Sequence, residues 1–245
     1  MSLWIIATFV AFFVKGLCGF ANTLVLTSIL SFGANNIIIS PVELVLGYPS
    51  NLILAIKERK SIDFKKCIPV AMLVLIGCVP GILFLKNTDT TVIKIVFGFV
   101  IIGIAVEMLL RMYIETKSKD KKAGKQSKVV LTIIGLLSGI LCGLYGIGAL
   151  LGAYFNRVTK DSKAFKANIC VVFLIENTFR IVMYSLLGII TLESLKYSLI
   201  LIPVMITGLL LGMFSAKFLK DKYAKVTVMI LLLLSGVSLV VTNLL

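Results

Sequence analysis

The sequence contains no histidine and few charged side chains. Of its 245 residues, only 15% are Asp, Glu, Lys or Arg, whereas a soluble globular domain carries about 25%. The lack of histidine excludes most zinc sites and every histidine-based catalytic triad. The five cysteines are scattered singly through apolar stretches without CxxC spacing, which favours neither a metal site nor a disulfide scaffold. We therefore expect no metal, no cofactor and no enzymatic activity.

Long apolar stretches dominate the chain instead. Hydrophobic residues make up 59% of it, and the mean hydropathy is +1.08. A helix crosses a bilayer core of about 30 Å with about 20 apolar residues, and in lipid the backbone must satisfy its own hydrogen bonds. We predict an all-α, polytopic protein of the cell membrane, with the lipid bilayer as a partner. The eight apolar segments are Leu3–Phe32, Pro41–Ile56, Cys67–Leu85, Val92–Leu110, Val129–Phe155, Ala167–Leu187, Tyr197–Ala216 and Val226–Leu244.

The first and fifth of these segments are too long for one straight crossing. Their central glycines are Gly16 and Gly19 in the first, and Gly143, Gly146 and Gly148 in the second. Each half would have about 12 residues, or about 18 Å of helix, which reaches just past the middle of a membrane. The pattern predicts either a re-entrant pair of half-helices or one discontinuous spanning helix at each place.

The chain also shows signs of duplication. Leu17-Cys18-Gly19 recurs as Leu141-Cys142-Gly143, and Asn51 has a counterpart in Asn177. In addition, Gly77, Gly81, Lys86 and Lys94 match Gly208, Gly212, Lys217 and Lys225 at a constant offset. We predict two four-segment repeats, at residues 1–111 and 129–245, each opening with a glycine-broken segment. A basic cytoplasmic linker at 112–128 would join them.

The distribution of basic residues favours inverted repeats. The formal net charge is +14, from 25 Lys+Arg against 11 Asp+Glu. If both broken segments are re-entrant, the loops at 57–66, 111–128, 157–166 and 217–225, which hold 20 of the 25 basic residues, share the cytoplasmic side. If both cross fully, the repeats run parallel and the last two loops lie outside. Basic and aromatic residues do not interleave, so we expect no nucleic acid as a partner and assign the charge to lipid headgroups.

These features resemble the sulfite exporter TauE/SafE family of membrane permeases over essentially the whole chain. The resemblance lies in the breaks KGLCGFANT and ILCGLYGIGALLG, the four-plus-four segment plan, the GxxxG-bearing third segments, and the polar or basic loop before the closing helix of each half. It implies transport of sulfur-containing anions such as sulfite, thiosulfate or sulfonates. Asn22 and Thr23 stand where the family has more glycine, which implies altered substrate contacts.

Half-helices that end inside a membrane offer unpaired backbone groups, and their N-terminal ends attract anions. Glycine lets the backbone approach a solute closely, although small residues also serve close helix packing. A cysteine there can be a small apolar residue, and an asparagine can join two helices. The predicted substrate-binding residues are Lys15, Gly16, Cys18, Gly19, Asn22, Thr23, Asn51, Cys142, Gly143, Tyr145, Gly146, Gly148, Asn177 and Arg180.

Charged residues within the apolar segments are the remaining candidates, because they are costly in a membrane. Glu176 and Arg180 lie four residues apart on one helix face. They form either a structural ion pair, or a site in which Arg180 binds an anion and Glu176 carries a proton. Lys15 is a second cation at the first break, unless it snorkels to the surface. Glu43, at the outer start of its segment, is expected to be an entrance or cap residue.

The function that the sequence favours is a secondary transporter of a small anion, a sulfur oxyanion or organosulfonate. It would work by alternating access and with proton coupling, either alone or as a homodimer. A passive anion channel and a carrier of another small organic anion are the alternatives. A membrane-embedded enzyme and a scaffold subunit are further rivals, and the lack of histidine and of clustered carboxylates counts against the enzyme.

Overall fold

The computed structural model describes residues 1–30, 34, 36–87, 128–146, 148–159 and 161–218, with parts of 95–110 and 230–241. Every regular element within these residues is helical, which confirms the all-α prediction. Apart from Lys128, the predicted linker at 112–128 lies outside the described residues, as does most of the last apolar segment.

Four helices among the described residues are long and apolar enough to cross a membrane. They are α3 (Asn36–Lys57), α4 (Phe64–Asn87), α8 (Ser162–Leu186) and α9 (Leu192–Ser215), and the short helix η1 (Arg59–Ser61) joins α3 to α4. Their outward faces are apolar: on α4, Ile68, Met72 and Ile76 recur every four residues and are more than half exposed. Such a stripe would be a liability in water but suits contact with lipid tails.

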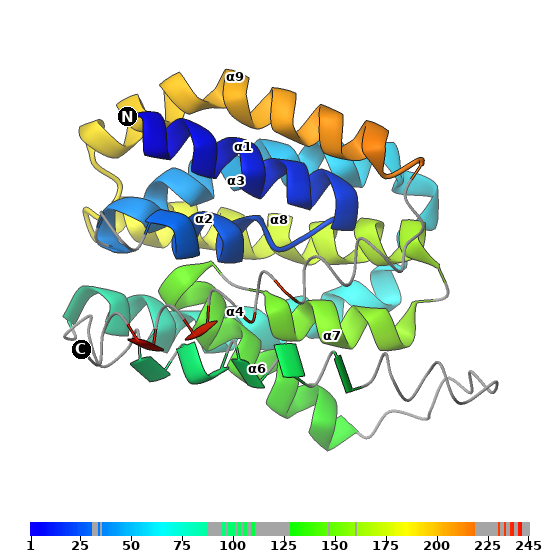
Figure 1. Cartoon of the computed structure of the whole chain (residues 1–245). Coiled ribbons are helices and arrows are strands. Elements are labelled where there is room, and N and C mark those ends of the chain that lie inside the picture. Colours follow the sequence, from blue (N-terminus) through cyan, green and yellow to red (C-terminus); the bar gives the residue numbers. More distant parts are fainter. Residues whose placement is uncertain are drawn as a thin grey trace.

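Both glycine-rich segments are interrupted helices. The first consists of α1 (Ser2–Cys18) and α2 (Asn22–Leu30), and the second of α6 (Lys128–Tyr145) and α7 (Ala149–Val158). The breaks lie at left-handed backbone conformations, with φ of 87° at Gly19, 74° at Ala21 and 73° at Gly146. A helix cannot continue through such residues. Figure 1 shows α2 turning back alongside α1, as in a hairpin.

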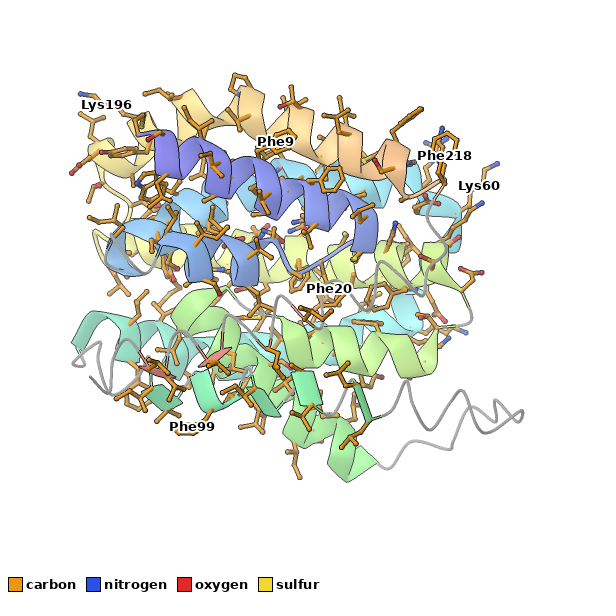
Figure 2. The ribbon with its side chains drawn as sticks, in the orientation of Figure 1. Phe9, Phe20, Lys60, Phe99, Lys196 and Phe218 are labelled. Atoms are coloured by element: carbon orange, nitrogen blue, oxygen red, sulfur yellow. The ribbon has the colours of Figure 1, made fainter. Side chains whose placement is uncertain are left out.

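Contacts between the helix ends define two ends of the bundle. The Asn168 side chain, near the start of α8, accepts a 2.7 Å hydrogen bond from the Asp63 backbone N–H and donates a 3.3 Å bond to the Ser61 carbonyl. The loops at 57–66 and 157–166 therefore share one end, here called the basic end. At the opposite end, Trp4 of α1 stacks on Tyr197 of α9 at 5.3 Å. Figure 2 shows Lys60 and Lys196 at these two ends.

Glycine contacts fix the directions of the half-helices. A Cβ at Gly16 would collide with α9 at Gly212 and its neighbours, and a Cβ at Gly208 would meet the Phe9 carbonyl. Residue numbers thus rise together along α1 and α9, which both start at the end opposite the basic end. In the same way, α6 lies against α4 with Gly139 at Gly77 and Gly143 at Gly81, so α6 starts at the basic end.

The two broken segments therefore enter the bundle from opposite ends. Each also packs mainly on a long helix of the other half, α1 on α9 and α6 on α4. Both observations support inverted repeats, although the division into repeats at 1–111 and 129–245 stays a prediction.

The structure corrects the residue matching between the two breaks. The sequence motif pairs Gly19 with Gly143, but the left-handed residues that end α1 and α6 are Gly19 and Gly146. Gly143, which packs on α4, corresponds instead to Gly16, which packs on α9. The shift is three residues, almost one helical turn. Cys142 is therefore the counterpart of Lys15 and not of Cys18. The positions of the left-handed and packing glycines define the equivalent residues, and the shared Leu-Cys-Gly sequence does not.

Candidate functional site

A small pocket lies between the first turn of α2 and the glycines that directly precede α7. The space open to the centre of a water molecule is about 10 Å³, which is enough for one water. Seven of the predicted binding residues line it, namely Lys15, Asn22, Thr23, Asn51, Gly146, Gly148 and Asn177. The other lining residues are Phe20, Ala21, Leu24, Glu43 and Phe173.

The N-terminal ends of both short helices flank this pocket. The first turn of α2 closes with a 3.1 Å bond from Val25 N–H to the Ala21 carbonyl, and that of α7 with a 2.9 Å bond from Gly152 N–H to the Gly148 carbonyl. The N–H groups at 22–24 and 149–151 consequently have no partner within their own helices. Ala21 and Gly148 line the pocket, and no side chain caps α7. Two helix ends with partial positive charge thus flank one pocket.

Lys15 brings a full positive charge to the pocket. It lies in the last turn of α1 and is 1% exposed, so it does not snorkel to the surface. Within the described part of the chain, no carboxylate lies within 4 Å of its ammonium, and the Phe12 ring centroid is 5.8 Å away. An ammonium buried without a carboxylate in direct contact is unfavourable. An anion in the pocket would relieve that cost.

Asn51 on α3 and Asn177 on α8 add neutral polar groups. Both are buried and line the pocket. The Asn51 Oδ1 atom has no hydrogen-bond partner among the described residues. A primary amide carries two N–H donors as well as an acceptor, so the pair can orient a polyatomic anion. The two matching residues therefore line one pocket, and their role in binding stays a prediction.

Arg180 is held just behind the pocket by an ion-pair network. Its Nε lies 3.5 Å from Glu176 Oε1, and its Nη1 lies 3.9 Å from Glu43 Oε2. Its Nη2 donates to Ser40 Oγ at 3.0 Å and to the Tyr184 hydroxyl at 3.3 Å. The predicted pairing of Glu176 with Arg180 is confirmed. Because Arg180 is fully buried and is not among the lining residues, the geometry favours a structural role over direct anion contact.

Glu43 lies in the pocket, and the prediction of an entrance or cap residue is wrong. α3 begins at Asn36, five residues before the expected Pro41, so Glu43 lies about two turns inside the helix. It is 4% exposed, and its Oε1 accepts 2.7 Å hydrogen bonds from Asn22 Nδ2 and Thr23 Oγ1. Acidic residues inside a membrane are usually functional. This rule would have indicated Glu43 if the predicted segment had begun at Asn36 and not at Pro41.

The protein-family model described as sulfite exporter TauE/SafE matches residues 4–239 of the chain. The chain belongs to the TauE/SafE family. No curated protein and no solved structure matches it. Family membership, with the four long apolar helices, makes it an integral membrane protein of a transporter family, and sulfur anions are the solute class that the family suggests.

The remaining predicted residues of this TauE/SafE protein lie outside the pocket lining. Gly16 and Gly143 serve close helix packing, and Gly19 contacts the Lys166 side chain. Cys18 ends α1, while Cys142 is buried within α6. Tyr145 is the last residue of α6, and its side chain is outside the described structure. Direct substrate contact by Gly16, Cys18, Gly19, Cys142 and Gly143 has no support in the geometry.

Proposed function

We propose that this TauE/SafE protein is a secondary transporter in the cell membrane for a sulfur oxyanion or organosulfonate, and that the pocket is its binding site. The observation that carries the proposal is the meeting of two half-helix N-termini with a buried ammonium that has no carboxylate partner among the described residues. The oxygens of a sulfur oxyanion accept hydrogen bonds from backbone N–H groups and from ammonium donors.

The ends of α1 and α6, with the turns that follow them, are here called the hairpin tips. They supply closures toward opposite ends of the bundle. Toward the basic end, Lys166 Nζ donates a 2.8 Å hydrogen bond to the Leu17 carbonyl, and Phe20 packs edge-on against Phe165 at 5.5 Å. Toward the other end, the Tyr184 hydroxyl donates to the Gly143 carbonyl at 3.0 Å. Lys166, Phe165 and Tyr184 all belong to α8.

This arrangement supports alternating access. A sulfite ion is larger than a water molecule, so the roughly one-water space must widen when it binds. Release of one hairpin tip at a time would open the pocket to one side of the membrane only. The sequence contains no nucleotide-binding motif, so an ion gradient, for which we propose protons, would supply the energy.

Counterflow tests the proposal directly. Purified protein in liposomes is expected to take up radiolabelled thiosulfate faster when unlabelled thiosulfate is present inside, because a carrier reorients faster when loaded. Sulfite and methanesulfonate should compete with the label, and acetate should not. Uptake that is indifferent to internal thiosulfate would favour the passive channel. Competition by acetate would favour a carrier of other organic anions, and no uptake of any sulfur anion would contradict the proposal.

A further inference from the structure

The Glu43 carboxylate lies between the two broken segments, at the point where a bound solute would also contact both. Glu43 Oε1 accepts hydrogen bonds from the side chains of Asn22 and Thr23, the first two residues of α2. Glu43 Oε2 faces the second break, since a Cβ at Gly146 would lie 2.7 Å from it. The Glu43 carboxylate therefore uses the side-chain donors at one of the two helix ends proposed to bind the anion.

The charges around Glu43 balance. Lys15 approaches from α1 and Arg180 from α8, and the second carboxylate, Glu176, is also on α8. The other titratable groups nearby are the Tyr184 hydroxyl on α8 and the Cys142 thiol on α6, both fully buried. The charged side chains of α9, which also packs on α3, are Glu193 and Lys196, and both are exposed. Two cations thus face two carboxylates.

An added anion would upset this balance. It would leave excess negative charge in a buried, low-dielectric site, which is costly. It would also compete with Glu43 Oε1 for Asn22 and Thr23. A proton on Glu43 relieves both difficulties. It balances the charge of a monovalent anion and halves the excess left by a divalent one, while the carboxyl group then needs fewer donors and its O–H can donate to the anion. Glu176 is less suited to this role, since it is paired with Arg180 at 3.5 Å and is not among the lining residues.

We infer that Glu43 is a built-in competitor of the transported anion and the acceptor of the proton that enters with it. This inference rests on the proposed function. Anion and proton bind together and leave together: the proton adds to Glu43 as the anion takes over the donors of α2, and it is released when the carboxylate returns to them. Coupling then follows from the charge balance of the site and from competition for one set of donors.

Proton uptake on binding tests this inference. Calorimetric titration with thiosulfate or methanesulfonate, in buffers that differ in ionisation enthalpy, gives the number of protons taken up per anion. Both probes stay ionised near neutral pH, so the uptake reports on the protein. We expect about one proton per anion for the natural sequence and none for Glu43→Gln. Glu43→Gln should also bind the anion about 10-fold more tightly under alkaline conditions, since the competitor is lost.

Glu176→Gln is the matched control. It removes the other buried carboxylate but leaves Glu43 on the side-chain donors of α2, so displacement of Glu43 by the anion should still take up a proton. Glu43→Asp keeps the charge but withdraws it from Asn22 and Thr23, so it should bind the anion more tightly and still take up a proton. This second variant serves if Glu43→Gln does not fold. Unchanged proton uptake in Glu43→Gln, uptake lost only in Glu176→Gln, or unchanged affinity in Glu43→Asp would each overturn the inference. If the natural sequence binds neither probe, the proposed function fails first, and the inference with it.

Discussion

Replacing Lys15 by Met should weaken anion binding about 10-fold or more and, at the same time, make the folded protein more stable. The ammonium is 1% exposed and has no carboxylate within 4 Å among the described residues. The cost of burying it therefore outweighs its longer-range attraction to Glu43, and an apolar side chain of similar length removes that cost. A hydrogen bond from a charged donor contributes about 1.5–3 kcal/mol, which corresponds to a loss of affinity of about 10-fold or more. Thermal unfolding in detergent, with and without thiosulfate, measures both effects.

Two matched variants separate the role of Lys15 from that of charge in general. Lys60→Met removes an exposed lysine from η1 and should change neither stability nor binding. Lys15→Arg retains the charge and should retain measurable binding. A Lys15→Met protein that unfolds at the original temperature and still binds thiosulfate with unchanged affinity would exclude Lys15 from the site.

Replacing Arg180 by Met should have the opposite effect on the fold. Arg180 pairs with Glu176 and Glu43 and donates to Ser40 and Tyr184. Its loss leaves two buried carboxylates without this cation, and breaking a buried ion pair from one side costs about 3–5 kcal/mol. We expect a large fall in the thermal unfolding temperature and poor recovery of folded protein by size-exclusion chromatography.

The double variant Arg180→Met/Glu176→Gln provides the internal check. Because one of the stranded carboxylates is then neutral, it should recover part of the lost stability, and the two substitutions should be non-additive. Arg59→Met, at an exposed position in η1, should be neutral. Full stability of the single Arg180 variant would show that the network does not hold α3 against α8.

Local signals in the sequence predicted a good part of this site. Two apolar segments too long for a straight span, each with central glycines, predicted the two interruptions, because a left-handed residue ends a helix whatever surrounds it. The spacing of Glu176 and Arg180 predicted their pairing, since residues four apart share a helix face. A lysine beside the first break predicted a cation in the pocket.

Contacts between distant segments could not be predicted in this way. The pairing of Glu43 with Asn22 and Thr23 depends on how α3 packs on α2, which no periodicity encodes. The position of Glu43 was also misjudged because α3 continues through Pro41 to Asn36, and membrane helices tolerate proline within their length. The Leu-Cys-Gly motif around Cys18 and Cys142 gave a wrong residue match between the two breaks for a related reason. The equivalent positions are set by how α1 packs on α9 and α6 on α4, which the motif does not encode.

α8 connects these observations. It carries Asn177 into the pocket, holds Arg180 and Glu176 behind it, and contacts one hairpin tip through Lys166 and the other through Tyr184. A small tilt of this helix would therefore loosen one closure and tighten the other. Such a movement would link the state of the binding site to the side of the membrane that it faces.

The position of a bound anion tests the central claim most directly. Selenite, the selenium analogue of sulfite, can be located in crystals of the protein by its anomalous scattering. The account predicts a peak between the first turns of α2 and α7, within hydrogen-bonding distance of Lys15 Nζ and weaker in crystals of the Lys15→Met variant. A peak confined to the surface loops, with none between the two broken helices, would contradict it.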